Sequence, residues 1–244
     1  WEEQVTKINT HKEDEIDNFF IYYLRSQFAN TIGESRNYDR DYHRVIFTPE
    51  INKKLKLLHD QKEIKSFLQN QFKYFSNLYN KIYEYSKNKS DEFVHIYYNR
   101  LNEMDSQFLL ILSACNFDDP HEMEKIKLIS YNVDRLFSLL QLQHSYDSND
   151  FNVAIYKINS EIRGKSVDKI KEVFDKHLLT LLSDTRGVQT TEVYSYGMFK
   201  NTGMELSKRF KRYFFARIEE FIAKNTKLNM KYSLYDLVSN TGSV

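Results

Sequence analysis

Residues 64–85, which read IKSFLQNQFKYFSNLYNKIYEY, decide the fold class of this 244-residue chain. Large apolar side chains recur there every three or four residues, a spacing that places them on one stripe of an α-helix. We interpret the stripe as a packing face, since aromatic stripes at helical spacing are core far more often than cofactor sites. The stripe consists of Ile64, Phe67, Leu68, Phe72, Phe75, Leu78, Tyr79, Ile82 and Tyr85.

The same periodicity continues along most of the chain. The sequence has only 6 glycines and 2 prolines, too few for the turns of a strand-rich fold. It therefore predicts an all-α protein, an irregular multi-helix bundle with no significant sheet. We expect the helix that carries Ile126, Val133 and Leu140 to be central, because it is apolar nearly all round at its end. Other predicted helices lie near residues 14–28, 93–104, 106–115, 151–162 and 167–186.

Local signals mark several helix ends. Thr48 can cap a helix that has Pro49 at its first position, where the missing N–H costs nothing. Asp119, followed three residues later by Glu122, is typical of a capping box. Gly187 is suited to end a helix.

The clearest candidate boundary falls near residues 185–191. It divides the chain into a helical body, 1–186, and a C-terminal helical segment, 187–244. One continuous domain remains an alternative, because no linker rich in proline, glycine or serine separates the two parts.

Composition limits the classes of partner. The formal net charge of +1 creates no global field toward nucleic acid or anionic lipid. The longest apolar run, residues 108–112, is far shorter than the roughly 20 residues that span a bilayer, so we expect no membrane partner. The single cysteine, Cys115, has apolar neighbours typical of a buried structural thiol. We expect a cytoplasmic protein.

No motif for chemistry stands out. The seven histidines are scattered and the glycines isolated, so the sequence indicates no metal, no cofactor and no phosphate loop. His95, Asn99, Arg100 and Glu103 could share one helix surface, but a solvated or interdomain face explains them better than catalysis. We therefore expect no catalytic residue in this chain.

A basic cluster near the C-terminus is the main candidate for DNA contact. Winding the helix at about 100° per residue places Leu206, Phe210, Phe214, Ile218 and Phe221 on one face. Basic side chains lie mostly opposite and could neutralise a few phosphates. Arg217 falls close to the apolar face, where it must snorkel or find a buried carboxylate. The DNA-contact candidates are Lys208, Arg209, Lys211 and Arg212.

A second, weaker group interleaves basic and aromatic residues, a mixture that suits phosphate contact with base stacking. Asp39 and Asp41 lie among its cations and weaken their field, so an ion-paired loop is the favoured interpretation. The candidates in this group are Arg36, Arg40, His43 and Arg44.

The chain contains the segments DNFFIYYLRS (17–26), NVDRLF (132–137) and RYFFARIE (212–219). These three segments resemble the helical middle of the GmrSD-type restriction proteins, which are bacterial phage-defence proteins. The resemblance covers essentially the whole chain. It implies a parent protein with a ParB-like, nucleotide-using N-terminal domain and a C-terminal HNH domain that cleaves DNA with a divalent metal.

The catalytic motifs of that family, an Asp-Gly-Gln-Gln-Arg type loop and a His-Ile-Glu-His type cluster, do not occur here. The resemblance therefore assigns no catalytic residue to this sequence. The chain begins on Trp1 and stops in a polar run at residues 240–244, ends typical of an internal fragment, so we expect flanking domains on both sides. The implied function is a non-catalytic helical scaffold between the nucleotide-using and nuclease domains. The alternatives are a DNA-contacting module and a homodimerisation module.

Overall fold

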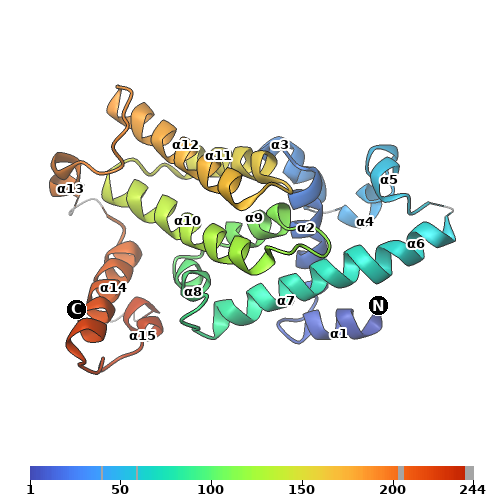
Figure 1. The fold of residues 1–244 in the computed structure, drawn as a ribbon, viewed down its shortest axis with the longest axis horizontal. Helices are drawn as coiled ribbons and strands as arrows, with labels where there is room; N and C mark the ends of the chain where they lie inside the picture. The colour runs from blue at the N-terminus through green and yellow to red at the C-terminus, as the bar shows by residue number, and fades with distance from the viewer. Residues whose placement is uncertain (40, 59, 203–205, 240–244) are drawn as a thin grey trace.

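The computed structural model describes residues 1–39, 41–58, 60–202 and 206–239. Every regular element in these ranges is a helix or a helical turn, which confirms the predicted all-α bundle (Figure 1). The elements that precede the longest rod of the molecule are α1 (Glu2–Asn9), α2 (Glu15–Phe28), α3 (Ile32–Ser35), the 3-10 turn η1 (Arg36–Tyr38), α4 (Tyr42–Val45) and α5 (Pro49–Leu55).

That rod contains the apolar stripe of residues 64–85. Helix α6 (Gln61–Phe67) continues through a π-helical turn, η2 (Leu68–Phe72), into α7 (Lys73–Lys87). The buried side chains of Phe67 and Phe72 are five residues apart, which would separate them by about 140° around an α-helix. The wider π turn brings them toward the same side of the rod. The stripe is thus confirmed from Phe67 onward, whereas Ile64 is 36% exposed.

The innermost helix is α9 (Ser106–Ala114). Its residues from Gln107 to Ala114 are all buried, and none of them carries a charge. Helices α2, α7, α10 (Glu122–Leu142) and α11 (Ser148–Ile162) pack around it. Helix α10 is buried on more than one side at its end, as expected, since none of residues 136–142 is exposed. Nearer its middle, Tyr131 is 46% exposed, so α9 is the more fully buried of the two helices.

The remaining helices complete two sides and one end of the molecule. In Figure 1, α11 and α12 lie along one side of α9 and α10, and α7 and α8 lie along the other. Helices α13, α14 and α15 gather at the end of the molecule opposite α5 and α6. These elements are α8 (Val94–Leu101), α12 (Val167–Arg186), α13 (Tyr196–Thr202), α14 (Lys208–Thr226) and α15 (Leu234–Ser239).

The structure confirms some of the predicted helix ends and contradicts others. Pro49 occupies the first position of α5, and Gly187 follows α12 with a left-handed φ of 66°, both as expected. Thr48 precedes α5, but its hydroxyl caps no backbone N–H and donates instead to the carbonyl of Val45. The predicted capping box of Asp119 and Glu122 does not form. Asp119 instead accepts hydrogen bonds from the backbone N–H groups of Asn116 and His121 and from Lys125 Nζ. It thereby organises the turn before α10.

The buried face of α14 also differs from the expected one. Phe210 is buried as predicted, but Ile218 and Phe221 are 38% and 68% exposed. The residues that face the body are Phe210, Tyr213, Ala216 and Glu220. Helix α14 is therefore rotated so that a mixed polar and aromatic face, rather than the most apolar one, packs inward.

Candidate functional site

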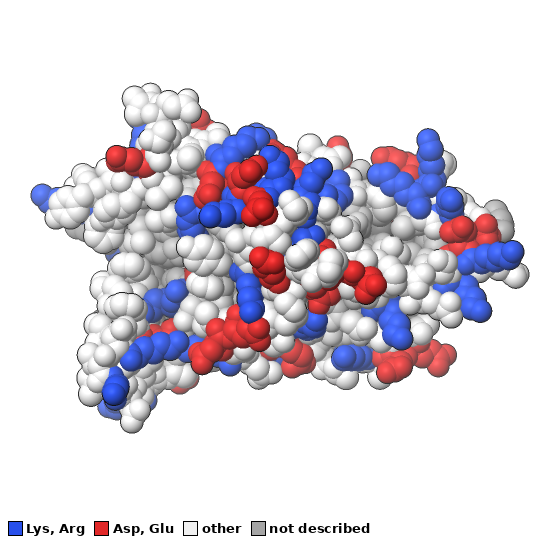
Figure 2. Space-filling model, in the orientation of Figure 1, with Lys and Arg blue, Asp and Glu red and all other residues white. Residues whose placement is uncertain are grey.

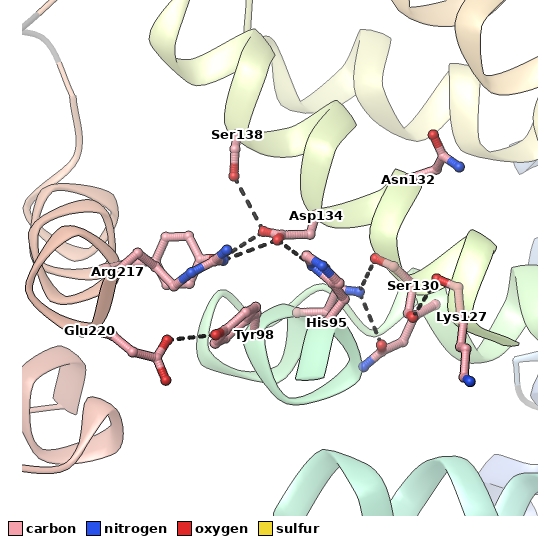
Figure 3. Close-up of polar contacts among 12 residues, drawn as sticks. His95, Tyr98, Lys127, Ser130, Asn132, Asp134, Ser138, Arg217 and Glu220 are labelled. Atoms are coloured by element: carbon pink, nitrogen blue, oxygen red, sulfur yellow. Dashed lines mark hydrogen bonds and ion pairs between the residues drawn. The ribbon is translucent and has the colours of Figure 1, made fainter. Parts of the chain in front are cut away.

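The centre of the candidate site is the carboxylate of Asp134, on the side of α10 that faces α8 and α14. This residue is only 5% exposed, so its charge needs compensation from the protein. His95 Nδ1 lies 2.8 Å from Oδ2, and Arg217 Nη1 donates to the same oxygen at 3.0 Å. The hydroxyl groups of Tyr213 and Ser138 donate to Oδ1 at 2.5 and 3.3 Å. Donors from three helices thus converge on one buried anion (Figure 3).

The charge balance at Asp134 favours the ionised carboxylate. Burial by itself would raise the pKa of Asp134, but the hydrogen bond with His95, the charge of Arg217 and the hydrogen bond from Tyr213 outweigh it. The pKa of this carboxyl group is consequently lowered from its ordinary value of 3.8. The site is therefore a compensated ion cluster rather than a neutral hydrogen-bond network.

Arg217 bridges the cluster to the face of an aromatic ring. Its guanidinium carbon lies 3.5 Å from the centroid of the Tyr98 ring, as close cation–π contact requires. This placement fulfils the expectation that Arg217 would find a buried carboxylate. The Tyr98 hydroxyl in turn donates to Glu220 at 2.5 Å, and Lys89 pairs with the other oxygen of Glu220.

A further anchor lies at the N-terminal end of α14. Arg209 donates from Nε and Nη2 to the backbone carbonyl of Leu101 at 3.0 and 2.8 Å, and it pairs with Glu103. Leu101 is the last residue of α8, so Arg209 satisfies a carbonyl that has no partner within that helix. Residues 209, 213, 217 and 220 therefore form a polar stripe that joins α14 to α8 and α10.

The DNA-contact candidates do not share one open face. Arg209 is engaged with α8, Lys211 and Arg212 are half-buried, and Lys208 is exposed. Their contact with DNA stays a prediction. The sequence interpretation placed Arg209 and Arg212 on the solvent side of the helix, whereas both line a cleft beside α8.

The secondary candidates are spread around a loop that is rich in ion pairs. Arg36 lines a shallow cleft together with Asp39 and Asp41, and Arg25 pairs with Asp39. His43 and Arg44 are exposed on the short helix α4, and Arg40 lies outside the described residues. The acidic neighbours agree with an ion-paired loop.

The four side chains weighed as a catalytic group diverge, and Arg100 lines the cleft beside α14. His95 is directed at Asp134, and Glu103 pairs with Arg209 at the far end of α8. Asn99 is fully buried and donates to Gln107 Oε1 and to the carbonyl of Ser130. The structure does not bring them together around a substrate-sized space.

Comparisons of this chain with protein-family models, with curated proteins and with solved structures found no match. Among the described residues, no three His, Cys, Asp or Glu side chains converge as ligands for a metal ion. None of the helices within those same ranges is both long and apolar enough to cross a membrane.

Replacing Arg217 with methionine tests the ion cluster. The substitution keeps an unbranched side chain over Tyr98 but leaves the Asp134 charge undercompensated. We expect the free energy of unfolding to fall by about 2–4 kcal/mol, somewhat less than for a fully buried pair because Arg217 is 28% exposed. Urea denaturation measures it. Lys224→Met on the same helix is the control, since Lys224 is 58% exposed and its charge interactions with Asp91 and Glu220 are screened by solvent. Equal effects of the two substitutions would contradict this account.

Acid titration provides a second test of Asp134. Its lowered pKa gives stability that is complete above the ordinary value of 3.8 and is lost as the pH falls toward the folded value. We compare the wild-type chain with Asp134→Asn, because His95 is itself one of the groups that lower the pKa of Asp134. The difference in unfolding free energy should shrink as the pH falls below about 4, where the carboxyl group of the unfolded chain takes up a proton. Urea denaturation at each pH gives this difference, and a gap that stays constant or widens in acid refutes the assignment.

Proposed function

We propose that this chain is a non-catalytic helical scaffold that couples domains on either side of it, as in the middle region of a GmrSD-type restriction protein. The observation that carries the proposal is the buried contact of Arg217 and Tyr213 with Asp134. It fixes the C-terminal helix α14 to the helical body.

Rigid attachment is what a coupling element needs. A flexible tether lets two domains move independently, whereas packed helices transmit a displacement from one end to the other. Three anchors hold α14 along its length, at Arg209, at Arg217 and at Glu220. A hinge between α14 and the body would have to break several charge-assisted hydrogen bonds at once.

The uses of the polar side chains also support a structural role. Asn99 and Asp134 each have several protein partners, and Arg209 completes the end of α8. Most of their donor and acceptor groups form hydrogen bonds that join helices. The resemblance of three segments to the family's middle region supports the same proposal, and the parent's nucleotide and metal requirements would belong to the flanking domains.

The coupling test uses the full-length protein with its flanking domains. We expect Arg217→Met to reduce nucleotide-stimulated DNA cleavage several-fold, because a loosened α14 transmits less of the conformational change. Hydrogen exchange of α14 peptides reports the loosening independently, and Lys224→Met serves as the matched control. Faster hydrogen exchange in α14 together with unchanged nucleotide stimulation of cleavage would contradict the coupling function.

We propose homodimerisation through the outer face of α14 as a second candidate function, because that face is unusually apolar for a surface exposed to solvent. Phe215, Phe221 and Ile222 are 64%, 68% and 50% exposed, and Ile218 between them is 38% exposed. Contiguous exposed apolar side chains are typical of protein contacts. In an antiparallel pair centred on Ile218, Phe215 of one copy would lie opposite Phe221 of the other.

Sedimentation velocity tests the dimer. We expect the wild-type chain to dimerise and Phe221→Lys to sediment as a monomer, because a lysine in the centre of an apolar contact must be desolvated. Val153→Lys, at an exposed apolar position of α11, should leave the dimer intact. A wild-type monomer at high concentration would rule the dimer out.

A further inference from the structure

A cleft of about 1050 Å³ opens between the C-terminal ends of α7 and α8 on one side and α14 and α15 on the other. Four basic side chains line it, against two carboxylates, so the lining carries a charge of +4 − 2 = +2. The whole chain carries only +1, and blue and red side chains are interspersed over the face in Figure 2. The positive charge of the cleft is therefore a local feature. Its charged residues are Lys87, Arg100, Arg209, Arg212, Glu103 and Asp105.

Two of these cations contact the same aromatic ring. Lys87 Nζ lies 4.6 Å and the Arg100 guanidinium carbon 6.0 Å from the centroid of the Tyr83 ring. Such contacts position each cation but do not neutralise it. Asp105 interacts by charge with Arg100 and offsets part of its charge, so the net positive charge of the cleft comes from all its walls together.

The opposite wall supplies further cations from α14. Arg209 is committed to Leu101 and Glu103, so that this carboxylate is already balanced. Arg212, one turn further along the helix, lines the same cleft. An anion placed between Arg100 and Arg212 would thus meet guanidinium groups from two different helices, the geometry that suits phosphate oxygens.

The cleft also offers aromatic surface. Tyr97 and Tyr235 belong to its lining, and Tyr235 is 60% exposed. Bases of nucleotides stack on exposed tyrosine rings with little dependence on sequence. The volume of the cleft suits a ligand of nucleotide size.

We propose that the cleft between α8 and α14 binds a nucleotide unit, with its phosphate between Arg100 and Arg212 and its base against Tyr235. The unit is either a free nucleotide or part of a single strand, since the two share this chemistry. This binding activity goes beyond the scaffold role. It uses other side chains, Arg100, Arg212 and Tyr235, although both roles need α14 to be docked on the body.

Isothermal titration calorimetry of the full chain tests the phosphate contact, with inorganic pyrophosphate, thymidine monophosphate and a short oligothymidylate as probes. We expect binding that weakens with salt, and about tenfold or greater weakening in Arg100→Gln/Arg212→Gln. The control Lys62→Gln/Lys65→Gln removes the same charge from exposed positions on α6, at the other end of the molecule (Figure 1). Absence of binding by all three probes, or equal weakening in the control, overturns the proposal.

A second variant tests the base contact. Tyr235→Leu should weaken binding of the nucleotide probes but leave pyrophosphate binding unchanged, since only the former can stack. Unchanged nucleotide binding in Tyr235→Leu overturns the base position. Tight monophosphate binding identifies a free nucleotide as the ligand, whereas binding of the oligothymidylate alone identifies a strand. Far-ultraviolet circular dichroism confirms that each variant is folded. Arg100→Gln/Arg212→Gln separates this site from the scaffold, because it leaves the contacts of Arg217 and Tyr213 with Asp134 in place.

Discussion

The compensation of one buried carboxylate, Asp134, holds the C-terminal part of this protein together. An isolated buried charge is far too costly to persist in a folded chain, so its donors must all be present in the native state. They come from α8, α10 and α14, and they meet only when these helices are packed in one arrangement. The ion cluster therefore selects a single docking geometry for α14, even though the cost of desolvating its charges offsets much of the stability that its contacts contribute.

The local parts of this architecture could be predicted from sequence, because helical periodicity is a local property. The stripe from Phe67 to Ile82 identified the rod, and Gly187 identified the end of α12. The innermost helix was harder to recognise. The burial of α9 depends on which helices surround it, and its short apolar run could not reveal that.

The orientation of α14 could not be predicted from the hydrophobic pattern of the sequence. Ranking faces by apolarity chose Phe214, Ile218 and Phe221, because exposed hydrophobic residues are costly, and of these only Phe214 packs against the core. The face that packs inward also carries Tyr213, Arg217 and Glu220. Their partners lie far away in sequence, Arg217 and Asp134 being 83 positions apart. Arg217 beside an apolar face did signal a buried carboxylate, but only the tertiary fold could identify Asp134 as that partner.

The π-helical turn η2 keeps two halves of one continuous rod against the same neighbour, α2. Before the turn, Phe67 lines a small cleft with Tyr23 and Leu55, and its ring centroid lies 6.3 Å from that of Tyr23. After the turn, the Phe75 ring lies 5.1 Å from the same tyrosine ring, and α7 packs on α1, α2, α8 and α9. Because one ring of α2 contacts both halves, a change of side-chain volume in α6 also affects the packing of α7.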